Sequence, residues 1–223
     1  PPATQPEVPS PETEATDWLL APPPAEPVPP RPLVPSRPSA EPPVLSPLST
    51  ESGDRFKRGL LVHRLLQSLP DLPEERRRTA AESYLARPVH GLDATAQTGL
   101  VDEVIGVLET PEFAPLFAPD SHAETPIVGT IEGPEGPEVV SGQVDRLVIR
   151  ENEIVIVDYK TNRPAPRQEN DVPEVYYRQM AAYRAVLRKI WPDRLIRCVL
   201  LWTDGPHTIS LSERQLDRYF DAF

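Results

Sequence analysis

The sequence predicts one α/β domain that follows a proline-rich segment, and three observations lead to this fold class. Of the 31 prolines, 17 lie in the first 50 of the 223 residues, where they favour extended chain. The remainder alternates between helical and strand patterns. Its central strands are apolar on both faces, which is typical of a sheet covered by helices on each side. We therefore expect a linker, extended or disordered, over residues 1–52 and a folded domain over residues 53–223.

The spacing of apolar residues predicts the order of elements in the domain. Pro73 can open a helix, because the first helical position has no intrahelical N–H bond to lose. Ser212 can cap the last helix, with Gln215 three residues further on. The expected elements are helices over 54–69, 73–87 and 94–109, strands over 124–131, 139–150 and 153–161, a helix over 172–190, strands over 195–203 and 207–211, and a helix from 212.

The two central strands carry two aspartates and a lysine. If Glu151 and Asn152 form the turn between these strands, Asp145 falls opposite Asp158. Side chains alternate with a period of two, so Asp158 and Lys160 share a face and Asp145 joins them there. The same alternation places the neighbouring apolar residues in two sets, Val144, Val148, Val155 and Val157 on one face and Leu147, Ile149, Ile154 and Ile156 on the other.

These three charged residues predict a metal-dependent site. Two opposed carboxylates repel each other unless a cation lies between them, and an oxygen-rich pocket suits Mg²⁺ or Mn²⁺. Lys160 would supply the positive charge that a reaction at a phosphate needs. Charged residues on strands are usually solvated, but a charge inside a sheet that is apolar on both faces needs a partner or a metal.

Four sequence blocks, taken in order, resemble the PD-(D/E)XK nuclease superfamily in its RecB-like branch. The resemblance covers about residues 54–223, and its blocks are Arg58-Gly59 with His63, Gly142-x-x-Asp145-Arg, Asp158-Tyr-Lys160-Thr and Gln179-x-x-x-Tyr183. It implies a restriction-endonuclease-like αβββαβ core with extra N-terminal helices.

The resemblance also implies the roles of the site residues. His63, Asp145, Asp158 and the backbone carbonyl of Tyr159 would bind the metal. Lys160 and Gln179 would act with the two aspartates in catalysis. Two further candidates are Glu124, at the head of the first strand, and Tyr183, which lies one helical turn after Gln179.

The activity implied is that of a Mg²⁺-dependent DNA exonuclease module within an ATP-dependent helicase–nuclease of double-strand-break repair and recombination. Its partners would be single-stranded or unwound DNA ends, upstream helicase domains of the same polypeptide and a second subunit of that complex. Two alternatives stay open, namely a self-sufficient RecB-like nuclease and an inactive DNA-binding or structural module. No Gly-rich phosphate loop for ATP occurs in this sequence.

The charge balance does not favour a freestanding DNA binder. The formal net charge is −11, and residues beyond position 50 include 21 basic and 28 acidic side chains. Proteins that bind DNA by themselves usually carry a basic surplus. We therefore expect another part of a larger machine to hold the DNA.

Cysteine content and the length of apolar runs indicate the cellular compartment in which the chain works. Cys198 is the single cysteine, so neither an internal disulfide nor a four-cysteine iron–sulfur cluster can form, which fits a reducing cytoplasm. No apolar run reaches the ~18 residues of a membrane span. Because the chain starts at Pro1 inside a proline-rich tract and has methionine only at Met180, we expect an excised fragment.

Overall fold

The structure is a computed structural model that describes residue 35 and residues 50–133 and 136–220. The linker expected over residues 1–52 therefore lies almost entirely outside the described residues.

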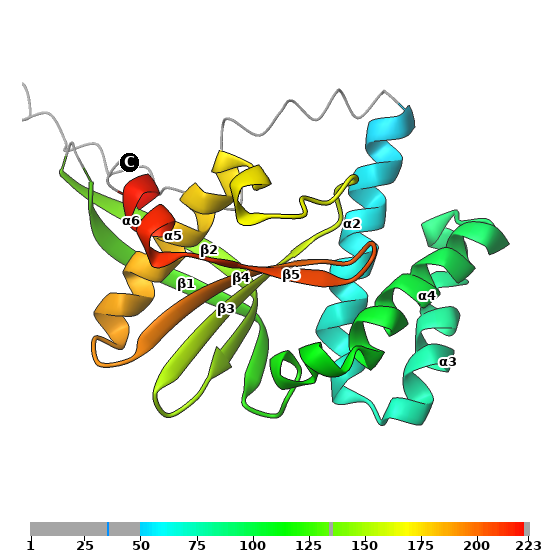
Figure 1. Ribbon diagram of the computed structural model, residues 1–223. Coiled ribbons are helices and arrows are strands. Elements are labelled where there is room, and N and C mark those ends of the chain that lie inside the picture. Colours follow the sequence, from blue (N-terminus) through cyan, green and yellow to red (C-terminus); the bar gives the residue numbers. More distant parts are fainter. Residues whose placement is uncertain (1–34, 36–49, 134–135, 221–223) are drawn as a thin grey trace, which may run out of the picture. The chain divides into compact units, whose positions relative to one another are not determined.

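A five-stranded mixed sheet forms the centre of the domain (Figure 1). The spatial order of its strands follows the sequence, and they are β1 (Ser121–Gly133), β2 (Gly136–Ile149), β3 (Glu153–Lys160), β4 (Leu195–Trp202) and β5 (His207–Leu211). The first three strands are antiparallel neighbours, β4 runs parallel to β3, and β5 is antiparallel to β4. A parallel pair needs a long crossover, and a helix provides it here.

Helices cover both faces of the sheet (Figure 1). On one face lie α2 (Thr50–Ser68), α3 (Glu74–Leu85) and α4 (Ala94–Glu109), and on the other lie the crossover helix α5 (Glu174–Ile190) and α6 (Glu213–Phe220). Short 3-10 helices join them: η1 (Leu69–Asp71), η2 (Pro88–His90), η3 (Pro111–Leu116) and η4 (Glu169–Asp171). This layering explains why the central strands are apolar on both faces.

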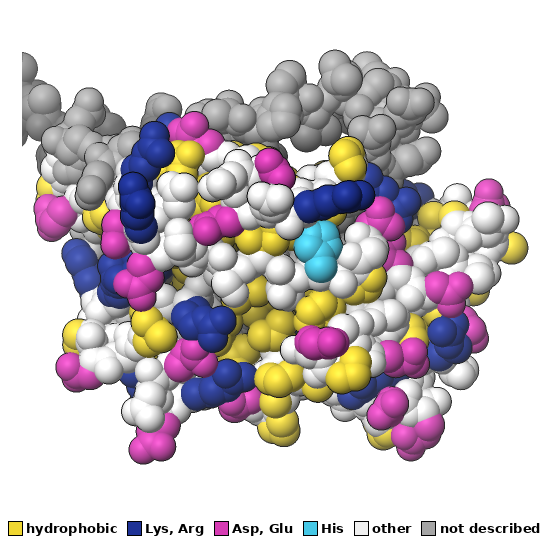
Figure 2. Space-filling view, viewed as in Figure 1, with side chains coloured by type: hydrophobic (Ala, Val, Ile, Leu, Met, Phe, Trp, Pro, Cys, Tyr) yellow, Lys and Arg dark blue, Asp and Glu magenta, His cyan; other side chains and the backbone are white. Residues whose placement is uncertain are grey.

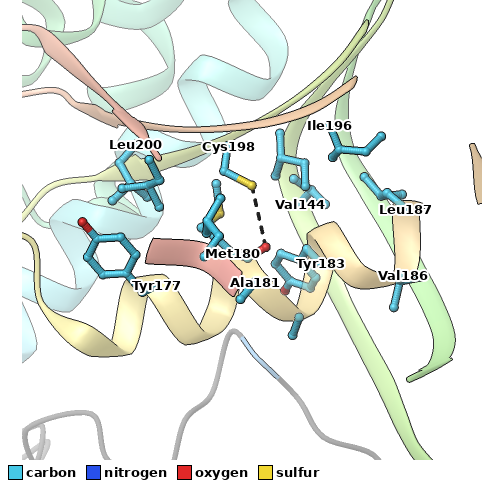
Figure 3. Close-up of a cluster of buried hydrophobic side chains, with 14 of the residues drawn as sticks. Val144, Tyr177, Met180, Ala181, Tyr183, Val186, Leu187, Ile196, Cys198 and Leu200 are labelled. Carbon is cyan, nitrogen blue, oxygen red and sulfur yellow. Dashed lines mark hydrogen bonds between the residues drawn. The ribbon is translucent and has the colours of Figure 1, made fainter. Parts of the chain in front are cut away.

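Two hydrophobic clusters hold the layers together. Met180 and Leu187 of α5 pack on Ile156 and Cys198 of the sheet, as Figure 3 shows in part. On the opposite face, residues of α2, α3 and α4 pack on Val148, Val155, Val157, Tyr159 and Leu201. Each cluster buries large aliphatic side chains almost completely, and this burial is the main force that joins helices to a sheet.

The sequence-based fold class is confirmed, since three strands, a helix and a strand follow the N-terminal helices in the expected order. The helix expected over 94–109 has these same bounds. The first strand is longer than expected, because it pairs with β2 from Ser121 to Gly133 with a single break at Glu124, including segments whose residues give no clear apolar alternation.

The expected register between β2 and β3 is confirmed as well. The ladder pairs Arg146 with Val157 and Ile149 with Ile154, and the N–H of Arg150 donates to the carbonyl of Glu153 at 2.9 Å. Asp145 and Asp158 therefore follow the last laddered pair.

The assignment of Val144 to the same face as Val148 is wrong. Val144 belongs to the cluster under α5, together with Leu147, and Figure 3 shows it beside Tyr183. The cause is a break in the β1–β2 ladder, which pairs the residues on either side of Glu124 and Asp145 but omits these two. Glu124 has a positive φ of 50°, and alternation on β2 changes phase at Asp145.

Candidate active site

A cleft of about 420 Å³ opens where α2 and α5 meet the end of the central strands. Residues from both helical layers and from the sheet line it, and they include His63 of α2, Glu124 of β1, Asp145 of β2, Asp158 and Lys160 of β3, and Gln179 of α5. The structure thus brings together side chains that are more than 100 positions apart in the sequence.

Asp145 is held by two hydrogen bonds. The backbone N–H of Tyr159 donates to Oδ2 at 2.6 Å, and Nδ1 of His63 lies 3.1 Å from Oδ1. If Nδ1 carries the proton, Nε2 of His63 keeps a lone pair for a ligand. Burial disfavours the imidazolium, but the Asp145 carboxylate outweighs this effect and raises the pKa of His63.

His63, Glu124 and Asp145 form a donor set that fits a divalent cation. Each offers one ligand atom, and these atoms all lie within 4.8 Å of one another. Burial, followed by the nearby Asp145 carboxylate, raises the pKa of Glu124, as expected for two acids that approach each other without a cation between them. Carboxylate oxygens suit Mg²⁺ and Mn²⁺, and an imidazole nitrogen adds a donor that suits Mn²⁺.

Asp158 and Lys160 form a second group beside this one. Lys160 Nζ lies 2.6 Å from Asp158 Oδ2, donates to Gln179 Oε1 at 3.2 Å and sits 3.8 Å from the centre of the Tyr176 ring. Burial raises the pKa of Asp158, against the effect of Lys160. Burial acts to lower the pKa of Lys160, but the Asp158 carboxylate outweighs it and raises that pKa, so the ammonium keeps its proton.

The structure therefore divides the predicted site into two groups. Asp145 and His63 lie together with Glu124, whereas the Oδ2 of Asp158 faces Lys160. The backbone of Tyr159 lies between them, with its N–H on Asp145.

Tyr183 lies behind the cleft and not in it. The side chain is fully buried, and its hydroxyl donates to the carbonyl of Gln143 at 3.2 Å. Gly142 makes this possible, because a Cβ at that position would overlap the phenol ring. Tyr183 thus fixes β2 just before Asp145, which differs from the cleft-facing position that its spacing from Gln179 predicts.

Arg146 is a buried guanidinium that joins three elements around the site. It donates to Tyr159 Oη at 2.8 Å, to Ser121 Oγ at 2.8 Å and to the carbonyl of Leu66 at 2.9 Å. Its charge also lies over the ring of Phe117, 4.9 Å from the centre. Since Leu66 is on the same helix as His63, Arg146 sets the position of that helix relative to β3.

Glu103 of α4 connects α2 with the segment that follows β4. It forms an ion pair with Arg58 and accepts a hydrogen bond from the hydroxyl of Thr203, while Arg58 donates to the carbonyl of Thr161 at 3.1 Å. Gly59 allows α2 to lie close to Thr161, because a Cβ at position 59 would be only 3.2 Å from Thr161 Oγ1. Sequence reasoning missed Glu103, since one acid in a helix usually belongs to a solvated face.

Surface charge and the thiol of Cys198 are two further features that bear on function. On the face shown in Figure 2, acidic and basic side chains are interspersed and do not separate by sign. Cys198 is buried, donates to the carbonyl of Met180 at 3.7 Å, and burial raises the pKa of its thiol to about 12. Such a thiol is not a nucleophile at neutral pH.

Within the described residues, no helix is long and apolar enough to cross a membrane.

Comparison with known proteins gives the family. The family model described as the PD-(D/E)XK nuclease superfamily matches residues 42–215, more than half of the chain. The chain therefore belongs to the PD-(D/E)XK nuclease superfamily.

One curated protein is similar in sequence to most of this chain. The A-type subunit of the ATP-dependent helicase/nuclease of Anoxybacillus flavithermus (strain DSM 21510 / WK1) is 26% identical over 157 residues, which cover 67% of this chain and 13% of the relative. The chain thus spans only a small part of that protein. A solved structure titled "Crystal structure of SSO0001" matches 74% of this chain and 81% of its own at 14% identity, with a TM-score of 0.33. Family and relative together support a nuclease role.

Proposed function

We propose that the chain is a Mg²⁺-dependent deoxyribonuclease module whose active site is the cleft between α2 and α5. The observation that carries this proposal is the pairing of two groups in one cleft. One group is the donor set of His63, Glu124 and Asp145, and the other is the Asp158–Lys160 pair, which is held by Gln179. Metal ligands and a fixed positive charge are two components of metal-dependent phosphodiester hydrolysis.

The residues that would hold Mg²⁺, or Mn²⁺ in its place, are His63, Asp145, Asp158 and the backbone carbonyl of Tyr159, with Glu124 as a further ligand. When bound, the ion supplies Lewis acidity toward the phosphate and lowers the pKa of a water molecule. The buried ammonium of Lys160 offsets negative charge that builds up on the phosphoryl oxygens. Gln179 orients this ammonium, and the hydrogen bond from Tyr159 fixes the Asp145 carboxylate.

The wider role that we propose is that of an exonuclease in double-strand-break repair and recombination. Because the relative's name describes one subunit of a helicase/nuclease, we propose upstream helicase domains on the same polypeptide and, as partner, the second subunit of such a complex, which is called AddB. The single cysteine fits a reducing compartment, and we therefore propose a cytoplasmic location. We keep the division into a linker over residues 1–52 and a nuclease domain over 53–223. A proline-rich tether would keep the nuclease close to the unwound strand at a raised effective concentration.

Cleavage of labelled single-stranded DNA tests the activity itself. The purified chain should shorten a labelled oligonucleotide in Mg²⁺ but not in EDTA, and Asp158→Asn should abolish shortening in Mg²⁺. Cleavage that persists in EDTA, or in the variant at more than a few per cent, would contradict the assignment.

A second experiment tests the helicase-linked role against a self-sufficient nuclease. The chain is compared with a polypeptide extended at its N-terminus through the helicase domains, on the same linear duplex, with and without ATP. We expect the extended polypeptide to be faster in ATP, because a domain with an acidic surplus holds duplex DNA poorly. Equal rates would favour the self-sufficient enzyme, and no metal-dependent cleavage in either protein would favour an inactive module.

A further inference from the structure

Two large apolar side chains are exposed at the cleft on successive turns of α2. Phe56 is 61% exposed and Leu60 is 57% exposed, and both line the cleft together with His63. They lie four residues apart and therefore project from the same helix face as His63, one further turn along. Exposed apolar side chains that gather at a functional cleft mark a binding surface.

The other side of the cleft is formed by α5 and adds Tyr176 and Val175. Lys160 lies over the ring of Tyr176, so the charged floor of the cleft adjoins an apolar wall. A ligand that fits both surfaces must carry negative charge next to a flat apolar group. A nucleotide has this combination, with its phosphate on one side and its base on the other.

We propose that Phe56, supported by Leu60, stacks on an unpaired nucleobase next to the phosphate in the cleft, and thereby selects single-stranded DNA. This inference rests on the proposed nuclease function and adds the residue that would distinguish a single strand from a duplex. Aromatic side chains bind single strands in this way because every base has a π-face, so the contact tolerates any sequence.

A duplex cannot make the same contact. Its bases are stacked on one another and paired, so it offers Phe56 sugars, phosphates and base edges but no free base face, except at an end. The acidic balance of the domain strengthens this selection, since it leaves little electrostatic grip on a continuous duplex.

Removing single bases tests the contact directly. A set of single-stranded oligonucleotides, each with one abasic nucleotide, is presented to the wild-type chain, and kcat/KM is measured in Mg²⁺. We expect a roughly tenfold loss at one position beside the cleaved bond, which is what a single stacked base contributes. In Phe56→Ala the intact oligonucleotide should be cleaved about tenfold more slowly, and the abasic nucleotide should cost nothing further. Phe56→Trp should restore both values.

Val128→Ala is the matched control, because Val128 is 67% exposed on β1 and does not line the cleft. It should behave as wild type on every substrate. If Phe56→Ala keeps the wild-type abasic penalty, or lowers the melting temperature by several degrees because Phe56 packs against another part of the chain, the inference is overturned.

Binding separates this inference from the nuclease proposal. Fluorescence anisotropy of a labelled intact or abasic single strand is measured in EDTA, so that no cleavage is needed. The same tenfold, Phe56-dependent difference should appear in Kd. If the wild type binds in this manner but never cleaves, the nuclease proposal fails and the stacking contact stands. If cleavage occurs but Phe56→Ala affects neither Kd nor kcat/KM, only the stacking contact fails.

Discussion

The backbone N–H of Tyr159 donates to the side chain of Asp145, and this 2.6 Å bond continues the β2–β3 pairing after the backbone ladder has ended. The last laddered pair is Arg146 with Val157, so the carboxylate takes the place of the next backbone acceptor. Oδ2 is thereby fixed, and Oδ1 is directed to His63. The position of a candidate ligand is therefore set by the sheet itself.

Asp158→Asn should abolish cleavage and leave the fold intact. The amide keeps the shape of the side chain and can still accept a hydrogen bond from Lys160, but it loses the negative charge that a metal requires. We expect at least a hundredfold loss of activity and a melting temperature within a few degrees of wild type. Asp158→Ala should lose activity to the same extent and should also melt at a lower temperature than Asp158→Asn. The alanine leaves the buried ammonium of Lys160 without any acceptor at this position. Thermal melting monitored by circular dichroism, in parallel with the cleavage assay, checks both outcomes.

Two variants of Glu124 can separate the backbone strain at this position from the role of its carboxylate as a metal ligand. At a φ of 50°, a residue with a Cβ costs about 1 kcal/mol relative to glycine. Glu124→Gly should therefore be more stable to urea than Glu124→Ala by about that amount. Both variants should lose affinity for Mn²⁺ equally in calorimetric titration, since both lack the carboxylate. Equal stability of the two variants would mean that the backbone relaxes once the side chain is removed.

Arg146→Lys should destabilise the domain even though it keeps the charge. One ammonium cannot reach Tyr159 Oη, Ser121 Oγ and the Leu66 carbonyl together, so buried acceptors lose their partner. We expect a loss of about 2–4 kcal/mol in the free energy of unfolding, measured with urea. Arg78→Lys is the control, because its pair with Asp102 is exposed and should leave the free energy of unfolding unchanged within the error of the measurement.

Asp217 should make the stability of the α5–α6 contact depend on pH. Burial acts to raise its pKa, but the hydrogen bond and charge of Arg184, together with Arg188, outweigh it and lower that pKa below 3.8. Because the pKa is depressed in the folded state, the stabilisation is present above 3.8 and is lost as the pH falls through the folded pKa. The difference in melting temperature between wild type and Asp217→Asn should be constant near neutral pH and vanish in acid. A difference that grows on acidification would reverse this assignment.

Much of the fold could be predicted because local patterns determine it. The two-residue turn at Glu151 and Asn152 fixes the β2–β3 register, and the apolar spacing of residues 94–109 gives both ends of α4. The candidate site residues Asp145, Asp158 and Lys160 also follow from that register, and the structure places all three at one cleft.

The remaining features depend on contacts between distant segments. The face of Val144 could not be predicted, because the phase change at Asp145 coincides with a break in the pairing to the neighbouring strand, where Glu124 has a positive φ. The position of Tyr183 depends on the space over Gly142, and the role of Glu103 depends on Arg58 and Thr203. None of these contacts produces a regular spacing of residues that could be recognised in the sequence.

The parallel pairing of β3 with β4 has a consequence for the order of folding. The β1–β2–β3 meander closes through short turns, whereas β4 can join only after the chain has passed through α5. Short loops close at a lower entropic cost, so we expect the Asp145–Tyr159 contact to form early and the His63–Asp145 contact, which joins residues far apart in the sequence, to form late. Pulsed hydrogen exchange during refolding should protect β2 and β3 before α5. A newly synthesised chain would then acquire its hydrolytic centre only in the last steps of folding, and partly folded chains would be harmless to the DNA around them.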